Sequence, residues 1–295
     1  MKKGIPILAL LLCCMIWGTT FVAVKQVSSK IDPFLLSTLR NTIAVIILLP
    51  LILLTKNSKS LKDKLALKNG FVLGLILAAI YVVQTIGLQF TSSTHSAFIT
   101  SSAVIMVPIM LVFTGKQKLS VQQIGSIFIV AFGLYFLTNS AENLTFNNGD
   151  LITFIGAIIC AVQIILAGYF VRKTNFLGLI FYQFLFSGVL SFIGLITNSI
   201  ILNKEIFFQE SAIYGVIYLG ILGTLFCFFV TVWAQKYVST IFTAMIFALE
   251  PVFASTASYV YSGELFTKVE LFGAVGVLLG LLIYNVPIKK VTSAT

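Results

Sequence analysis

Residues 247–254 read Phe247-Ala248-Leu249-Glu250-Pro251-Val252-Phe253-Ala254 and lie inside an apolar run from Ile241 to Tyr261. As a helix rising about 1.5 Å per residue, this run is close to the roughly 30 Å thickness of a hydrocarbon core. Glu250 would then lie near the middle of the membrane, where ionisable groups face a bundle interior or a water-filled cavity. Pro251 removes a backbone donor and frees a carbonyl one turn earlier in the helix. The stretch therefore predicts a membrane helix with one face toward a polar space.

The composition of the whole chain indicates a membrane protein. Of its 295 residues, 59% are hydrophobic and 9% are charged, against about 25% charged residues in ordinary soluble domains. The mean hydropathy is +1.06. The net charge of +10 does not indicate nucleic-acid binding, because the lysines and arginines lie in short gaps between apolar runs.

The four cysteines are Cys13, Cys14, Cys160 and Cys227, and all of them fall inside apolar runs. None has the spacing of a metal-binding motif, so we expect small core residues rather than disulfides or metal ligands. No metal site and no cofactor are expected.

Ten apolar runs are long enough to cross a membrane, and charged residues, Gly, Pro or Asn separate them. They cover residues 6–25, 34–54, 70–90, 95–114, 122–138, 150–170, 178–200, 211–235, 240–261 and 270–287. The joints at 91–94 and 236–239 must be tight hairpins if the count is ten. We therefore predict an all-α membrane protein with ten spans.

The basic residues are divided unequally between the two sides of this topology. With the N-terminus inside, fourteen lie in inner segments, four in outer segments, and Arg40 within a span. The inner set is Lys2, Lys3, Lys56, Lys59, Lys62, Lys64, Lys68, Lys116, Lys118, Arg172, Lys173, Lys236, Lys289 and Lys290, and the outer set is Lys25, Lys30, Lys204 and Lys268. Because cytoplasmic loops carry an excess of positive charge, both termini are predicted to be cytoplasmic.

The two halves of the chain resemble each other at an offset of about 143 to 148 residues. Asp32-Pro33-Phe34-Leu35 corresponds to Thr174-Asn175-Phe176-Leu177, and Gly87-Leu88-Gln89-Phe90-Thr91-Ser92 corresponds to Ala234-Gln235-Lys236-Tyr237-Val238-Ser239. Each half holds five spans, an odd number, so the second half must enter the membrane from the opposite side. Inverted repeats of this kind are common in secondary transporters, which bind substrate at the repeat interface near the midplane.

Four further pieces of sequence point to a known family. They are Trp17-Gly18-Thr19-Thr20-Phe21-Val22-Ala23-Val24-Lys25, Leu39-Arg40, Leu249-Glu250-Pro251-Val252-Phe253-Ala254 and Gly263-Glu264. In this order, with the repeat and the topology, the chain resembles the drug/metabolite transporter superfamily, in particular its ten-helix EamA-type family. The first half departs from the pattern, because it has Gly115-Lys116 where the second has Gly263-Glu264, and Pro108 lies about one turn later than the equivalent of Pro251.

The resemblance covers residues 7–287 as two tandem EamA-like units, 8–138 and 150–286. It implies a multi-pass carrier in the bacterial cytoplasmic membrane that moves a small metabolite, often outward, through a central cavity. An amino acid or a related compound is the substrate class that the family suggests.

Two charged residues within the spans are candidates for the transport site. An unpaired Glu250 could exchange protons as substrate moves, which makes it a candidate for proton coupling; alternatively, it only fixes a helix bend. Arg40 could pair with an anionic group of the substrate, or it could bond helix-end carbonyls or Glu250 and hold two spans together.

Polar and aromatic residues in the spans complete the predicted substrate site. Trp17 and Thr20 lie three residues apart, as do Tyr81 and Gln84, and Gln163 lies in the sixth span. Such residues suit a small-molecule site, although each could also pack between helices or lie in an interfacial belt.

The remaining polar and small residues have simpler interpretations. The single histidine, His95, has no partners with metal-ligand spacing, so we expect a hydrogen-bonded residue at a helix start. Gly70 with Gly74 and Gly276 with Gly280 predict close helix packing, and a homodimer contact through the tenth span is the alternative.

Other functional classes lack the residues that they need. No GxxxxGK[ST] loop is present, so ATP is not expected to drive transport directly. An intramembrane enzyme would need paired carboxylates, HExxH or a Ser/His pair at membrane depth, so no catalytic residue is expected. A channel or a sensor remains the alternative function; it would require polar pore rings or an output domain.

Overall fold

The computed structural model describes residues 4–115, 117–138, 147–201, 203–262 and 267–285. Within these ranges the regular elements are helices, and the β pairing is limited to an isolated bridge between Ile31 and Phe208. Eight helical stretches are long and apolar enough to cross a membrane, and a shorter apolar helix covers Val121–Leu137. The prediction of an all-α membrane protein is confirmed. Seven of the residues named from the sequence lie outside the described ranges, namely Lys2, Lys3, Lys116, Gly263, Glu264, Lys289 and Lys290.

The described residues of the first half form five helical rods. They are α1 (Gly4–Val27), α2 (Pro33–Leu54), α3 (Lys64–Phe90), the pair α4 (Ser93–Ser101) and α5 (Ala103–Phe113), and α6 (Val121–Thr138). A short 3-10 turn, η1 (Ser58–Lys62), precedes α3. The third rod begins six residues earlier than the predicted 70, because the Asp63 side chain accepts hydrogen bonds from the backbone N–H groups of Leu65 and Ala66 and caps the helix there.

In the second half, too, the part of the chain that the structure describes forms five rods. They are α7 (Asn148–Phe170), α8 (Phe176–Ile201), a composite rod, the pair α11 (Thr240–Phe247) and α12 (Glu250–Ser262), and α13 (Lys268–Asn285). The composite rod consists of η2 (Glu210–Ala212), α9 (Ile213–Tyr218), the π-helix η3 (Leu219–Phe226) and α10 (Cys227–Ala234). The sequence predicted the fourth and ninth spans as single apolar runs, with a backbone defect at Pro251 in the ninth. The structure interrupts these spans at Ser102 and at Ala248–Leu249.

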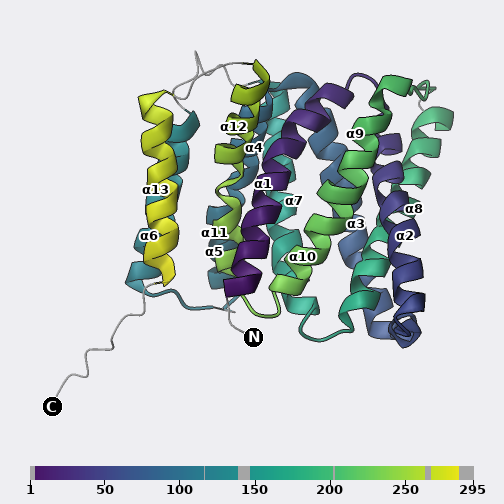
Figure 1. Ribbon diagram of the computed structural model, residues 1–295, viewed down its shortest axis with the longest axis horizontal. Coiled ribbons are helices and arrows are strands. Elements are labelled where there is room, and N and C mark those ends of the chain that lie inside the picture. Colours follow the sequence, from purple (N-terminus) through teal and green to yellow (C-terminus); the bar gives the residue numbers. More distant parts are fainter. Residues whose placement is uncertain (1–3, 116, 139–146, 202, 263–266, 286–295) are drawn as a thin grey trace.

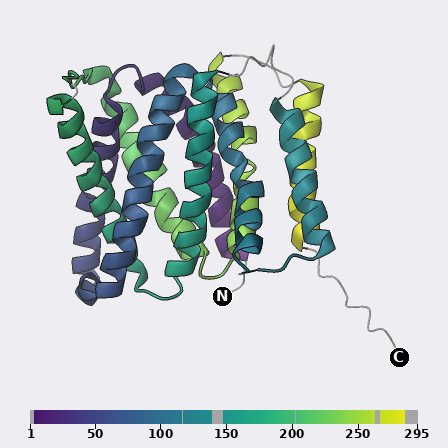
Figure 2. The same cartoon turned by 180° about the vertical axis from the view of Figure 1, so that it is seen from behind.

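The rods stand roughly parallel, and the two ends of the described chain lie at the same end of the molecule (Figure 1). The α6 and α13 helices form one edge of the bundle, whereas α2 and α8 form the opposite edge. The view from behind shows the same order (Figure 2). The largest buried apolar cluster lies between α1, α5, α6, α11 and α13.

Glycines permit the closest helix contacts, as predicted. A Cβ added to Gly70 would lie 2.4 Å from the Tyr182 Cβ, and one added to Gly74 would lie 2.8 Å from the Gln183 carbonyl oxygen, so α3 packs directly on α8. Gly276 and Gly280 face α6. Within the described part of the chain, this second pair is therefore used for packing inside one molecule.

Two cations tie helix ends together at matching places in the two halves. Lys25 donates to the carbonyl oxygens of Leu88 (2.7 Å) and Thr91 (2.8 Å) at the end of α3. Arg172 donates to those of Gln235 (3.3 Å) and Val238 (3.4 Å) after α10. A cation beside a helix C-terminus is stabilised by the unpaired carbonyls and by the helix dipole. Because each residue of the second tie lies 147 positions after its counterpart, the ties support the predicted repeat.

Candidate functional site

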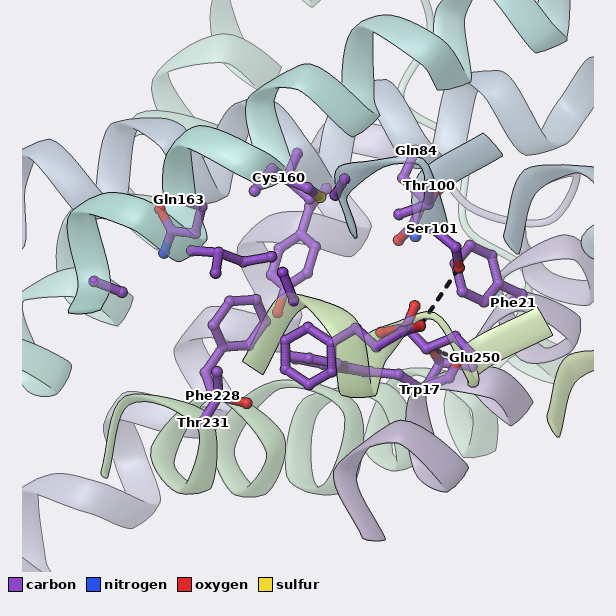
Figure 3. A pocket seen from close by; sticks show the side chains of 18 of the residues that line it. Trp17, Phe21, Gln84, Thr100, Ser101, Cys160, Gln163, Phe228, Thr231 and Glu250 are labelled. Atoms are coloured by element: carbon purple, nitrogen blue, oxygen red, sulfur yellow. Dashed lines mark hydrogen bonds between the residues drawn. The ribbon is translucent and has the colours of Figure 1, made fainter. Parts of the chain in front are cut away.

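A cavity of about 90 Å³ lies in the centre of the bundle, between helices of both halves (Figure 3). It is lined by Trp17, Thr20, Phe21, Arg40, Ile80, Tyr81, Gln84, Thr100, Ser101, Ala103, Cys160, Gln163, Ile164, Ala167, Phe228, Thr231, Val232, Ala244, Phe247 and Glu250. The seven residues that the sequence predicts for the substrate site are all among them. The structure thus brings these residues together, and their contact with substrate stays a prediction.

Arg40 is held in place from two sides. Its guanidinium carbon lies 3.9 Å from the centre of the Tyr81 ring, so the cation stacks on the aromatic face. Its Nε donates to the Thr224 hydroxyl (3.0 Å), to which the Tyr81 hydroxyl also donates (3.0 Å). The side chain is 2% exposed, yet its Nη1 has no partner. This leaves one donor of a fixed cation available to an acceptor in the cavity.

The π-helix η3 places Thr224 beside this cation. A Cβ added to Gly223 would lie 3.0 Å from the Thr20 methyl and 3.5 Å from the Arg40 Nη2, so the glycine lets η3 approach α1 and α2 closely. The Gly223 carbonyl accepts from the Trp17 indole N–H at 2.9 Å. Single π turns often occur at functional sites because they rearrange backbone hydrogen bonds. Thr224 does not line the cavity, and it was not among the residues predicted from the sequence.

Aromatic rings form the apolar wall of the cavity. Trp17 makes edge contacts with Phe228 (centroids 5.2 Å apart) and Phe247 (5.0 Å), and Tyr81 contacts Phe228 (6.0 Å). These contacts fix the ring orientations around the space. The sequence analysis identified Trp17 and Tyr81 but missed both phenylalanines, because phenylalanine is common throughout this chain.

Glu250 begins α12 directly after the break in the ninth span. Its side chain is 6% exposed and has neither a hydrogen bond nor an ion pair within the described ranges. The carboxylate points into the cavity on the side of Gln84, Thr100 and Ser101, away from Gln163 (Figure 3). Arg40 and Glu250 line the same cavity, but the proposed bridge between them is not formed. The cavity thus presents a cation and an anion that are both available.

Further polar groups in the wall also lack partners. The Nε2 and Oε1 atoms of Gln163 and the hydroxyl of Thr231 are buried without a hydrogen bond. Buried polar groups are normally satisfied, so unpaired ones mark places for water or ligand. Together with Arg40 and Glu250 they make the centre of an apolar bundle a polar binding space.

Other predicted features have clear places in the structure. His95 lies in the first turn of α4, where its backbone N–H donates to the Ser92 hydroxyl at 3.1 Å. Cys13, Cys14 and Cys227 are buried, whereas the half-buried Cys160 lies on the cavity wall instead of in the core.

Comparisons with known proteins agree with this arrangement. A protein of Archaeoglobus fulgidus described as an uncharacterized transporter is 28% identical over 94% of this chain and 85% of its own length. The uncharacterized transporter YoaV of Bacillus subtilis is 23% identical over 90% and 92%. A solved crystal structure shares the fold, with a TM-score of 0.76 at 15% identity over 96% of each chain.

The match to a protein family extends over both halves of the chain. Residues 4–139 and 147–286 each match the EamA-like transporter family. The chain therefore belongs to the EamA-like transporter family and is a multi-pass membrane protein.

Proposed function

We propose that this protein is a secondary active transporter that exports a small zwitterionic metabolite, such as an amino acid, across the bacterial cytoplasmic membrane. The observation that carries the proposal is the central cavity, in which Arg40 offers an Nη1 without a partner and Glu250 offers an unpaired carboxylate. The cation could receive a carboxylate, and the carboxylate could receive an ammonium group or a coupling cation. The aromatic wall suits an apolar side chain between the two charged ends.

Alternating access between two inverted five-helix repeats is the proposed mechanism. Two observations support it: the paired ties of Lys25 and Arg172, and the interruption of the fourth and ninth rods at Ser102 and Ala248–Leu249. Broken helices at corresponding places in two repeats are typical of transporters that bind substrate near the midplane. In this proposal α6 and α13 are the fifth and tenth spans, both termini face the cytoplasm, and no cofactor takes part.

Counterflow into proteoliposomes tests the proposal. The purified protein is supplied with a pool of amino acids and small metabolites, and uptake of each is measured. Saturable exchange of one compound is expected, with at least a tenfold lower rate for Glu250→Gln at unchanged protein level. Glu210→Gln, which changes an exposed acid of η2, is the matched control and should behave as the unmodified protein.

Two results would contradict the proposal. Flux that rises linearly with concentration would indicate the alternative function, a channel. Full activity of Glu250→Gln would remove Glu250 from the transport cycle.

A further inference from the structure

The two broken helices meet at their breaks. The half-helix α4 ends at Ser101, and the half-helix α11 ends at Phe247. The Ser101 Oγ lies 3.4 Å from the Phe247 carbonyl oxygen, and these residues are 146 positions apart, within the offset that relates the two halves. The negative ends of two helix dipoles therefore converge on one point of the cavity wall, an arrangement that favours a cation.

The two oxygens that meet there have at most one proton between them, that of the Ser101 hydroxyl. The Ser101 hydroxyl has a single hydrogen, and the Ala97 carbonyl accepts it at the shorter distance of 2.8 Å. The Phe247 carbonyl would normally accept from the residue four positions later, but that residue is Pro251, which has no N–H. One hydroxyl hydrogen thus serves two carbonyl acceptors, and the Phe247 carbonyl receives the longer and weaker of the two hydrogen bonds.

The distance between these oxygens suits a small metal cation. Two oxygen ligands at about 2.4 Å from one ion, at a right angle to each other, lie about 3.4 Å apart. Water molecules could also bridge the pair, but the local charge favours a cation. A larger ion such as K⁺ would hold its ligands farther apart.

Glu250 supplies a negative charge at the junction where Ser101 meets Phe247. Its carboxylate is buried and unpartnered, and it points to the side of the cavity that holds Ser101 (Figure 3). Gln84 and Thr100 lie on the same side and can contribute further oxygens. One carboxylate balances one positive charge, and the described residues contain no cluster of three acidic, histidine or cysteine side chains that would suit a divalent or transition metal.

We propose that the junction of Ser101, Phe247 and Glu250 is a sodium-binding site. The site opens into the central cavity, which Arg40 also lines. Bound Na⁺ would neutralise the Glu250 carboxylate, and the Nη1 of Arg40 would remain free for the anionic group of the substrate. A role of Na⁺ as the coupling ion rests on the proposed transport function, whereas the binding of Na⁺ to this site does not. The coupling ion predicted from the sequence for Glu250 was a proton, with a helix bend as the structural alternative.

Thermal unfolding in detergent tests the site without any transport assay. The unmodified protein is titrated with NaCl at constant ionic strength and constant pH, with choline chloride as the replacement salt and KCl as the comparison. A saturable rise in Tm with Na⁺ alone is expected. Ser101→Ala should weaken the apparent affinity for Na⁺ at least tenfold, and Glu250→Gln should abolish the rise.

Ser102→Ala is the matched control for the loss of a hydroxyl. The Ser102 hydroxyl donates to the Ile99 carbonyl at 2.6 Å and does not line the cavity, so this variant should retain the response to Na⁺. A rise in Tm that is the same for Na⁺, K⁺ and choline would overturn the site. So would a response that Ser101→Ala leaves unchanged, provided that this variant unfolds cooperatively.

Flux measurements then separate the two proposals. Transport driven by a Na⁺ gradient at equal pH supports sodium coupling. Transport driven by a pH gradient in the absence of Na⁺, without any response of Tm to Na⁺, overturns the sodium site but leaves the transporter standing. A Na⁺-specific rise in Tm without transport of any solute would preserve the site and contradict the proposed function.

Discussion

At the scale of single residues, the main feature is a cation in an apolar bundle that is positioned but not neutralised. Arg40 is stacked on Tyr81 and bonded to Thr224, and no acidic side chain pairs with it within the described ranges. Burial of an unpaired charge costs several kcal/mol, so the protein must retain Arg40 at the expense of stability. An anionic substrate group that pairs with the free Nη1 would recover part of this cost.

We expect Thr224→Ala to impair transport although Thr224 does not line the cavity. The change removes the acceptor for both Arg40 Nε and the Tyr81 hydroxyl, and a hydrogen bond to a charged group contributes about 1.5–3 kcal/mol. The apparent affinity for substrate should fall roughly tenfold or more, as measured by counterflow at varied substrate concentration. Thr224→Ser keeps the hydroxyl and should restore most of the affinity; if serine fails where alanine fails, Thr224 acts through packing alone.

At the scale of helices, backbone contact through glycine holds the edge of the bundle together. A Cβ added to Gly273 of α13 would lie 2.4 Å from the Leu137 backbone nitrogen and 2.5 Å from the Gly133 carbonyl oxygen of α6. Backbone atoms cannot rotate away as the end of a side chain can. The α6 and α13 helices can therefore pack this closely only if the position carries no side chain.

Gly273→Ala should consequently separate α6 from α13. Overpacking of this kind costs about 1–3 kcal/mol, which we expect as a Tm lower by several degrees in detergent. Gly125→Ala in α6 is the matched control, since an added Cβ there meets no atom within 4 Å. An equal effect of both substitutions would show that glycine content, rather than the close contact, determines stability.

At the scale of the whole molecule, a single carboxylate links a loop of the first half to the second half. Asp63 caps α3 with one oxygen and accepts from the Asn175 backbone N–H with the other, at 3.0 Å. The hydrogen bond from Asn175 is the main reason why the pKa of Asp63 lies below its usual range. The folded protein therefore keeps this group ionised to a lower pH than the unfolded chain does.

This link should make stability depend on pH in the acid range. The contribution of Asp63 is present above the unfolded pKa of about 3.9 and is lost as the pH falls through the lower folded value. Asp63→Ala should lower stability by about 1 kcal/mol at pH 7, since it also removes a helix cap. The difference in Tm between the two proteins should shrink below about pH 4; a difference that stays constant down to pH 2 would contradict this account.

Much of this architecture was predictable, because a membrane leaves few alternatives to apolar helices. Eight of the predicted spans coincide with apolar helices of sufficient length, and the seven candidate site residues share one cavity. Polar groups at membrane depth avoid lipid, so Glu250, Arg40 and Gln163 had to face the interior. The ten-span count and the inversion of the repeats stay predictions that the matching ties support.

The helix breaks and the π-helix were not predictable in the same way. The break at Ser102 has neither Gly nor Pro at that position, and Pro108 lies six residues later. The Ser101 and Ser102 hydroxyls donate to the Ala97 and Ile99 carbonyls of their own helix, and such bonds bend helices; Ser101 also contacts Phe247 across the bundle. Thr224 was missed for a similar reason, because nothing in the spacing of an apolar run shows where a helix widens to bring one hydroxyl to a distant arginine.

The ties made by Lys25 and Arg172 have a consequence for the energetics of opening. The last residues of α3 and of α10, beside which the ties lie, are at opposite ends of the bundle (Figure 1), and in this structure both ties are formed at once. If α1 moves away from α3 to open one end of the cavity, the hydrogen bonds of Lys25 must break. If α7 moves away from α10 to open the other end, the hydrogen bonds of Arg172 must break. In the proposed alternating-access cycle each opening therefore breaks one tie, and the Arg172 tie, with hydrogen bonds of 3.3 and 3.4 Å against 2.7 and 2.8 Å for Lys25, is the weaker of the two.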